Sequence, residues 1–167
     1  IQVTSFVNPK IVPQMADAAD LAALLPVSDH VTFSALVLNL KGLERAAAAG
    51  IKKVDMGVPA SETLAKKNAN TSIEDGMKEM ELMVVKAREH RIKVRAGVQV
   101  AFGCAYEGKI EQAKVVSMSR RFLAMGIDEL SLSDSAGLGN PQLIRRIVQE
   151  VLPMAGNVPV VLHLHDT

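Results

Sequence analysis

The amino-acid sequence predicts an α/β fold built on a parallel β-sheet. Short runs rich in β-branched residues alternate along the 167 residues with Ala- and Leu-rich segments of helical length. This alternation is typical of consecutive βαβ units, whose right-handed crossovers allow either an open doubly wound sheet or a closed (β/α) barrel. No Gly-rich fingerprint follows the first expected strand, which counts against a dinucleotide-binding fold.

Six strands and five helices are expected along the chain. The strand segments are 1–6, 31–37, 53–58, 93–101, 128–132 and 160–165. The helical segments are 13–25, 40–49, 72–91, 110–125 and 141–154. Gly50 and Gly126 mark helix ends, while Ser72 and Pro141 mark helix starts. Because a (β/α)8 barrel has eight strands and about 250 residues, we expect either an open sheet or a piece of a barrel.

The composition indicates a single globular domain covering residues 1–167. Hydrophobic residues make up 49% of the chain and charged residues 22%, which is typical of soluble domains. A net charge of +1 and an aromatic content of 3% argue against a nucleic-acid or membrane surface. The single cysteine, Cys104, excludes an internal disulfide and fits a reducing compartment.

Two histidines at the end of the last expected strand form the first candidate site. Side chains two apart in a strand point to the same face, so His163 and His165 project together. Parallel barrels place their sites at this end of the strands, and two neutral imidazoles can share one divalent metal ion. Asp166 could orient a ligand. The alternatives are that one histidine binds and one packs, or that both line a polar barrel mouth.

A second candidate lies at the end of the preceding strand, in LSLSDSAGLGNP. Asp134 follows alternating serines there and precedes a Gly-rich turn. A carboxylate at the carboxyl end of a strand is well placed as a general base or a substrate anchor. The alternative is an aspartate that stabilises the turn or caps the next helix.

A third candidate is an arginine inside an apolar strand. Arg95 is costly to bury unless it is paired, so we expect it to meet a carboxylate or an anionic substrate at the barrel mouth. The alternative is a purely structural ion pair. In the loop that follows, Cys104 is either a reactive thiol or simply a small apolar residue.

Polar residues also occur inside the first expected strand. Gln2, Thr4 and Phe6 share one face of it, and Val3 and Ser5 share the other. Polar residues inside a parallel strand again suggest a site at a barrel mouth.

Lys66, Lys67 and Asn68 are expected to form a loop. Such a loop could contact phosphate groups, and the alternative is a solvated surface. We assign no role to His30 or His90.

Taken together, several segments resemble the 3-hydroxy-3-methylglutaryl-CoA (HMG-CoA) lyase family of metal-dependent aldolase and Claisen-type barrels. They occur in the family's order and cover nearly the whole chain. The matching stretches are IQVTSFVNPKIVPQM, LNLKG, ASETLAKKNANTSIE, VRAGVQVAFGCAYEGKI, MGIDELSLSDSAGLGNP and VVLHLHDT. The combination of VTSFV, GC-YEGKI and H-HDT is far more specific than an isolated pair of histidines.

The resemblance implies a (β/α)8 TIM barrel that binds Mg²⁺ or Mn²⁺, with Zn²⁺ also possible. It implies cleavage of HMG-CoA into acetyl-CoA and acetoacetate, as in leucine degradation and ketone body metabolism. The expected partners are an acyl-CoA substrate and a second copy of the chain, in the cytoplasm or, in a eukaryote, in the mitochondrial matrix. The family's metal ligands fall on His163 and His165, its catalytic aspartate on Asp134 and its active-site arginine on Arg95.

The resemblance further implies that His163 transfers a proton and that Ser5 and Asn68 contact the substrate. Where the family has a catalytic glutamate, this chain has Gln2, which cannot take up a proton. This difference indicates a lost or altered activity, another substrate or an engineered change. The alternatives to the lyase are therefore a non-catalytic barrel fragment or homologue, or a related acyl-CoA aldolase or Claisen synthase.

Some of the family's residues have no counterpart in this chain. The family's first strand carries an Arg-Asp pair whose aspartate binds the metal, and its last strand and the following loop supply an asparagine ligand and a cysteine. The six expected strands match the family's strands two to seven. We therefore expect this chain to cover about six of the eight βα units of the barrel.

Overall fold

The computed structural model describes residues 1–165 and contains a six-stranded parallel β-sheet. Within these residues the strands follow one another across the sheet in chain order. They are β1 (Gln2–Ser5), β2 (Ser34–Leu36), β3 (Lys53–Pro59), β4 (Lys93–Gln99), β5 (Glu129–Ser133) and β6 (Val160–His163). The predicted βαβ alternation with a parallel sheet is confirmed.

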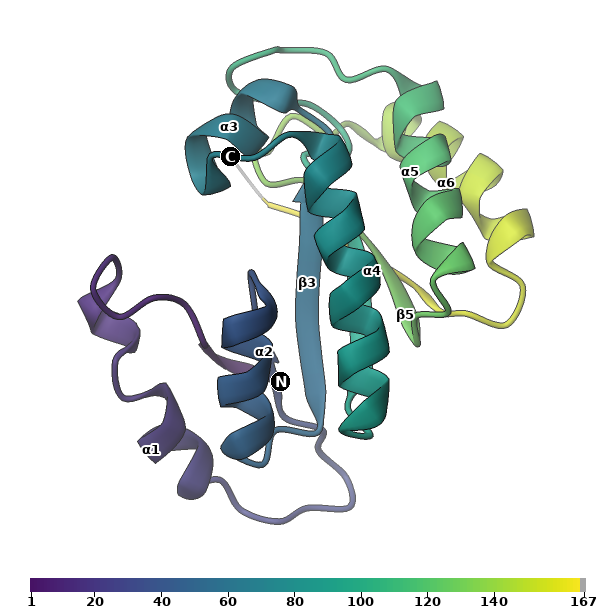
Figure 1. Cartoon of the computed structure of the whole chain (residues 1–167). Coiled ribbons are helices and arrows are strands. Elements are labelled where there is room, and N and C mark those ends of the chain that lie inside the picture. The colour runs from purple at the N-terminus through teal and green to yellow at the C-terminus, as the bar shows by residue number, and fades with distance from the viewer. Residues whose placement is uncertain (166–167) are drawn as a thin grey trace. The chain divides into compact units, whose positions relative to one another are not determined.

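Helices occupy the connections between the strands (Figure 1). They are a short 3-10 turn η1 (Pro13–Met15), α1 (Ala18–Ala23), α2 (Leu40–Ala48), α3 (Glu62–Ala69), α4 (Ile73–Glu89), α5 (Gln112–Ala124) and α6 (Pro141–Ala155). Four of the five predicted helices are found with ends shifted by at most two residues. No helix within residues 1–165 is long and apolar enough to cross a membrane.

The continuous helix predicted over 13–25 is wrong. The structure divides this segment into η1 and the six-residue α1, separated by a turn at Ala16 and Asp17. Asp17 makes no capping hydrogen bond, and Pro26 disfavours helical geometry in the residue before it.

The loop predicted at Lys66, Lys67 and Asn68 is also wrong, because all three lie in α3. The Ser61 side chain caps this helix by accepting the Leu64 N–H at 3.0 Å. The helix ends at Asn70 in a left-handed conformation with φ 51°.

The chain packs as two compact units that share β3, β4 and α4. Unit 1 comprises Ile1–Met56 and Glu79–Arg95, and unit 2 comprises Gly57–Lys78 and the chain from Ala96 onward. In unit 1, β1 pairs in parallel with β2, and β2 with β3. Its buried core contains Phe6, Leu43, Val54, Met83 and Val94.

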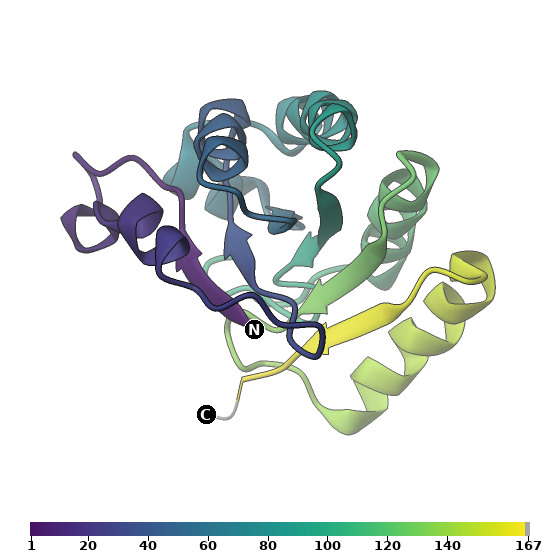
Figure 2. The same ribbon diagram turned by 90° about the horizontal axis from the view of Figure 1, so that it is seen from below.

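Unit 2 places β5 and β6 side by side, and Figure 2 shows α6 leading back into β6. The parallel register pairs Leu130 with Val160 and Ser133 with His163. Its core is built from buried apolar side chains of the helices and strands. They include Met118, Phe122, Leu130, Leu132, Ile147 and Val151. This register carries the polar ends of both strands to the same level.

Gly97 allows β4 to approach β5 closely, and this leads to a stability prediction. A Cβ atom at residue 97 would collide with the backbone of Ser131, which cannot move without breaking the sheet. We expect Gly97→Ala to lower the free energy of unfolding by about 3 kcal/mol, measured by urea denaturation. In Gly76→Ala, the control, the new Cβ makes an ordinary 3.4 Å contact with Val58 inside a helix. That variant should gain about 0.5–1 kcal/mol, and equal losses in both would contradict the steric argument.

Candidate functional site

A buried carboxylate organises the polar side chains of unit 1. Asp55 lies in β3 and is 7% exposed. Arg95 on β4 donates from Nε to Asp55 Oδ1 at 2.5 Å, and the Ser34 hydroxyl on β2 donates to Asp55 Oδ2 at 2.5 Å. A buried charge is tolerable only when it is paired and hydrogen-bonded, and here both carboxylate oxygens are engaged. The network therefore joins three strands of unit 1 and orients the guanidinium of Arg95.

The pairing of Arg95 with a carboxylate is confirmed, and it fits both the expected site and the alternative of a structural ion pair. The position of Arg95 at a barrel mouth stays a prediction. The carboxylate is one that the sequence analysis did not single out. Asp55 interrupts the apolar run of β3, KVDMGVP, in the same way that Arg95 interrupts β4. Two opposite charges inside neighbouring apolar strands were the sequence signal that could have predicted this ion pair. Pairing them required the tertiary structure, which brings Arg95 Nε to Asp55 Oδ1.

The predicted residues of β1 lie at different depths. Gln2 is exposed and lies opposite Ser34 in the parallel register, while Ser5 is half-buried and lies opposite Leu36. A register shift between Gln2 and Thr4 interrupts the strict alternation expected for this strand. Thr4 is buried. Gln2 and Ser5 thus both belong to unit 1, as does Arg95.

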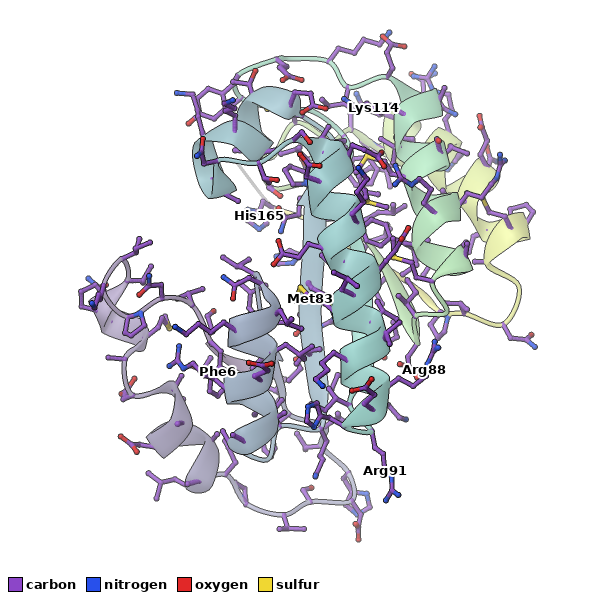
Figure 3. The ribbon with its side chains drawn as sticks, in the orientation of Figure 1. Phe6, Met83, Arg88, Arg91, Lys114 and His165 are labelled. Atoms are coloured by element: carbon purple, nitrogen blue, oxygen red, sulfur yellow. The ribbon has the colours of Figure 1, made fainter. Side chains whose placement is uncertain are left out.

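His163 and His165 converge at the end of β6, as their spacing predicts. Their Nε2 atoms are 3.0 Å apart, and both side chains are exposed. Figure 3 labels His165 at the end of the described chain. The ring centroids are 5.0 Å apart with the planes tilted by 47°. The juxtaposition is confirmed, and the role of the pair remains a prediction.

Asp134 lies beside this pair in unit 2 and is 2% exposed. Its backbone N–H donates to the His163 carbonyl oxygen at 2.8 Å. Its carboxylate accepts the Leu138 N–H at 3.0 Å and the Gly139 N–H at 2.9 Å. A Cβ at residue 139 would lie 2.8 Å from Asp134 Oδ2, so glycine permits this close approach. The structure therefore shows the turn-stabilising interaction that was the alternative for Asp134.

Asn68 lies on the exposed last turn of α3, in unit 2. This helix contacts the loop of residues 104–108 at two points. The Thr63 N–H donates to Glu107 Oε1 at 2.7 Å and lowers the pKa of that carboxyl group. Lys67 Nζ lies 4.8 Å from the centre of the Tyr106 ring. The loop therefore fixes the position of the helix that carries Asn68.

The thiol of Cys104 is buried in this loop, with 1% exposure. Burial raises the pKa of the thiol, but hydrogen bonds from the Ser61 hydroxyl and from the N–H groups of Tyr106 and Glu107 outweigh it. The net pKa of Cys104 lies below its ordinary value. Its burial agrees with the packing alternative, because a solvent reagent cannot reach the sulfur without an opening of the loop.

The chemistry of the histidine pair fits a divalent cation, because neutral imidazole nitrogen is a common ligand of divalent transition metals. The two Nε2 atoms lie 3.0 Å apart, a distance at which one ring can donate a hydrogen bond to the other. His163 and His165 would hold such an ion together with further ligands. Within residues 1–165 no group of three or more His, Cys, Asp or Glu side chains is placed to hold a metal. Asp166, expected to orient a ligand, lies outside the described residues.

The network around Asp55 leads to a second stability prediction. In Asp55→Ala, the half-buried guanidinium of Arg95 and the buried hydroxyl of Ser34 lose this acceptor, so we expect a loss on the order of 3 kcal/mol in a urea melt. Ser34→Ala should cost about 1 kcal/mol, since it removes one neutral donor. The control is Glu74→Gln, which breaks an exposed ion pair to Arg121 and should leave the melt nearly unchanged. A loss in Asp55→Ala no larger than in this control would contradict the network.

The chain is similar in sequence to known proteins. The HMGL-like family model matches residues 10–167. The mitochondrial hydroxymethylglutaryl-CoA lyase of Homo sapiens is 39% identical over 167 residues, which are 100% of this chain and 51% of that protein. The 3-hydroxy-3-isohexenylglutaryl-CoA/hydroxymethylglutaryl-CoA lyase of Pseudomonas aeruginosa is 36% identical and covered over 56% of its length. The chain spans about half the length of the curated relatives it matches.

Solved structures give the same result. The crystal structure of hydroxymethylglutaryl-CoA lyase from Pseudomonas aeruginosa superposes with a TM-score of 0.93 at 36% identity, over 100% of this chain and 56% of that one. The structure of an HMG-CoA lyase from Acinetobacter baumannii in complex with coenzyme A and 3-methylmalate superposes with a TM-score of 0.91 at 28% identity. The match covers 97% of this chain and 53% of that one. The predicted partial barrel fold is confirmed, and within residues 1–165 it comprises five complete βα units and a sixth strand. The chain belongs to the HMGL-like family.

Proposed function

We propose that the protein containing this chain is a divalent-metal-dependent carbon–carbon lyase. It cleaves HMG-CoA, or a close 3-hydroxy-3-alkylglutaryl-CoA, into acetyl-CoA and a 3-oxo acid, which is acetoacetate for HMG-CoA. The observation that carries the proposal is the convergence of His163 and His165 at the end of β6, in a chain of the HMGL-like family. The names of the relatives support an acyl-CoA substrate.

The proposed metal ligands in this chain are His163 and His165. When bound, the Mg²⁺ or Mn²⁺ would polarise the substrate oxygens and hold them in a fixed geometry. An imidazole nitrogen of His163 would accept the proton of the tertiary hydroxyl group. The C2–C3 bond of the substrate then breaks, its electron pair stays on C2 as the thioester enolate, and C2 takes up a proton to give acetyl-CoA.

Arg95 and Asp134 have supporting roles in this proposal. Arg95, oriented by Asp55, would offset the negative charge of the enolate. Asp134 would assist His163 as a base or orient it. Each of its carboxylate oxygens accepts one backbone N–H and keeps a further lone pair for this role. Ser5 and Asn68 would contact the substrate. We also propose that residues 1–167 form part of one catalytic barrel domain.

The proposed setting follows the relatives, whose names place them in mitochondria or in the cytoplasm. We propose that the protein acts as a homo-oligomer in the cytoplasm, or in the mitochondrial matrix of a eukaryote, in leucine degradation or ketone body formation. The second candidate function is a non-catalytic member of the family with a role in assembly. Gln2 favours this candidate, because it cannot take up a proton.

The test is the release of acetyl-CoA from HMG-CoA by the full-length product of the gene that encodes this chain. We expect release with Mg²⁺ or Mn²⁺ and none after EDTA treatment. His163→Ala and His165→Ala should each lower kcat by at least about 100-fold, since each removes a proposed ligand. His90→Ala, at the exposed end of α4, is the matched control and should retain activity. No release with either metal would favour the non-catalytic candidate.

A separate prediction concerns residue 2. We expect Gln2→Glu to raise kcat for HMG-CoA by about 100-fold, the contribution typical of one acid–base group. The exposed position of Gln2 on β1 leaves room for the carboxylate. Gln2→Met, of similar volume and no charge, is the control and should stay at the parent rate. A parent protein already as fast as Gln2→Glu would show that the acid is dispensable here.

A further inference from the structure

A cavity of about 450 Å³ lies in unit 1, where the loop that follows β1 meets the start of α2. Its wall includes Asn8 and Lys10 from the loop and Asn39, Lys41 and Arg45 from α2 and its cap. Phe6 forms part of it, and Figure 3 labels this side chain near α2. The volume lies within the range of small-molecule sites. The loop follows the carboxyl end of a parallel strand, where α/β proteins bind ligands.

The lining of this cavity is cationic. Three of its nine residues are basic, two are asparagines and none is acidic. Within residues 1–165, no ion pair joins Lys10, Lys41 or Arg45 to a carboxylate. The lining as described therefore contains three cations and no carboxylate that would neutralise them. An anionic ligand would supply the missing opposite charge.

Arg45 is held in place before any ligand arrives. Its Nη1 donates to the Val7 carbonyl oxygen at 2.9 Å, and its guanidinium lies 5.5 Å from the centre of the Phe6 ring. Phe6 is 1% exposed, so the ring is a fixed support. A guanidinium fixed in this way binds an oxyanion with little further loss of side-chain freedom.

Lys10 and Lys41 both lie in hydrogen-bonded backbone segments. Lys10 donates its N–H to Asn8 Oδ1 at 3.0 Å, and Asn8 O accepts the N–H groups of Ile11 and Val12. Lys41 lies in the first turn of α2, which contains no acidic residue. A cation at the amino end of a helix opposes the helix dipole, so helix stability does not account for Lys41.

We propose that this cavity, the Lys10–Lys41–Arg45 pocket, binds phosphate groups. The lining offers the planar guanidinium of Arg45 and the ammonium groups of Lys10 and Lys41. This combination suits a diphosphate or two nearby phosphates. Two sources share this chemistry: the phosphates of a coenzyme A thioester and free phosphate or diphosphate. The coenzyme source rests on the proposed function, whereas phosphate binding itself rests on the charges and the cavity.

The experiment measures binding by isothermal titration calorimetry, without turnover. The ligands are coenzyme A, inorganic pyrophosphate, and pantetheine, which lacks phosphate. We expect Lys41→Ala and Arg45→Met each to raise the Kd for the phosphate ligand at least 10-fold, while any pantetheine binding is unchanged. Lys52→Ala, an exposed lysine of the same unit outside the pocket, is the matched control and should leave Kd unchanged. Circular dichroism melts confirm that each variant is folded.

The outcomes separate the sources and the two proposals. Variant-sensitive binding of coenzyme A but not of pyrophosphate supports the pocket with the coenzyme as ligand. Equally tight, variant-sensitive pyrophosphate binding supports the pocket with a free anion. The pocket proposal is overturned if neither coenzyme A nor pyrophosphate binds. It is also overturned if Lys41→Ala and Lys52→Ala change Kd equally. If the protein shows no lyase turnover but its phosphate binding still depends on Lys41 and Arg45, the proposed function fails and the pocket proposal stands.

Discussion

The hydrogen-bonded ion pair between Asp55 and Arg95 is the interaction on which the polar side of unit 1 depends. A carboxylate that is 7% exposed would be strongly destabilising alone. The guanidinium of Arg95 and the hydroxyl of Ser34 occupy its two oxygens, so neither charge is left without a partner. The same contacts orient Arg95, and the proposed enolate stabilisation requires that orientation. Here one network accounts for both the stability of three strands and the position of a candidate functional group.

In unit 2 the strand register has the corresponding importance. Ser133 lies opposite His163, and the next residue, Asp134, donates its N–H to the His163 carbonyl oxygen. Because side chains alternate along a strand, a slip of one residue would turn His163 to the other face of the sheet. On the other side of β5, Gly97 permits the close approach of β4, since any side chain there would push β4 away from β5.

Several features of the site could be predicted because local chemistry alone specifies them. The spacing of His163 and His165 predicts their convergence, and the cost of burying Arg95 predicts a charged partner. The interpretation of residues 66–68 as a loop failed for another reason. The helix signal, Ser61 as a cap followed by Glu62 and ended by Asn70, was present, but the lysines and asparagines suggested a loop. The helix is held by Glu107 and Tyr106, which lie about 40 residues further along the chain.

The sequence by itself determined the order of the six strands and of four helices, the parallel sheet and the family, because periodicity, capping residues and motifs are local properties. It also located the histidine pair and Asp134 at or near strand ends, and Arg95 inside a strand. Only the tertiary structure decided that Asp55 is the partner of Arg95, that the Asp134 carboxylate is taken up by Leu138 and Gly139, and that three separate cations surround one cavity. These are contacts between distant or differently oriented segments, and they depend on register and packing, which no local pattern encodes.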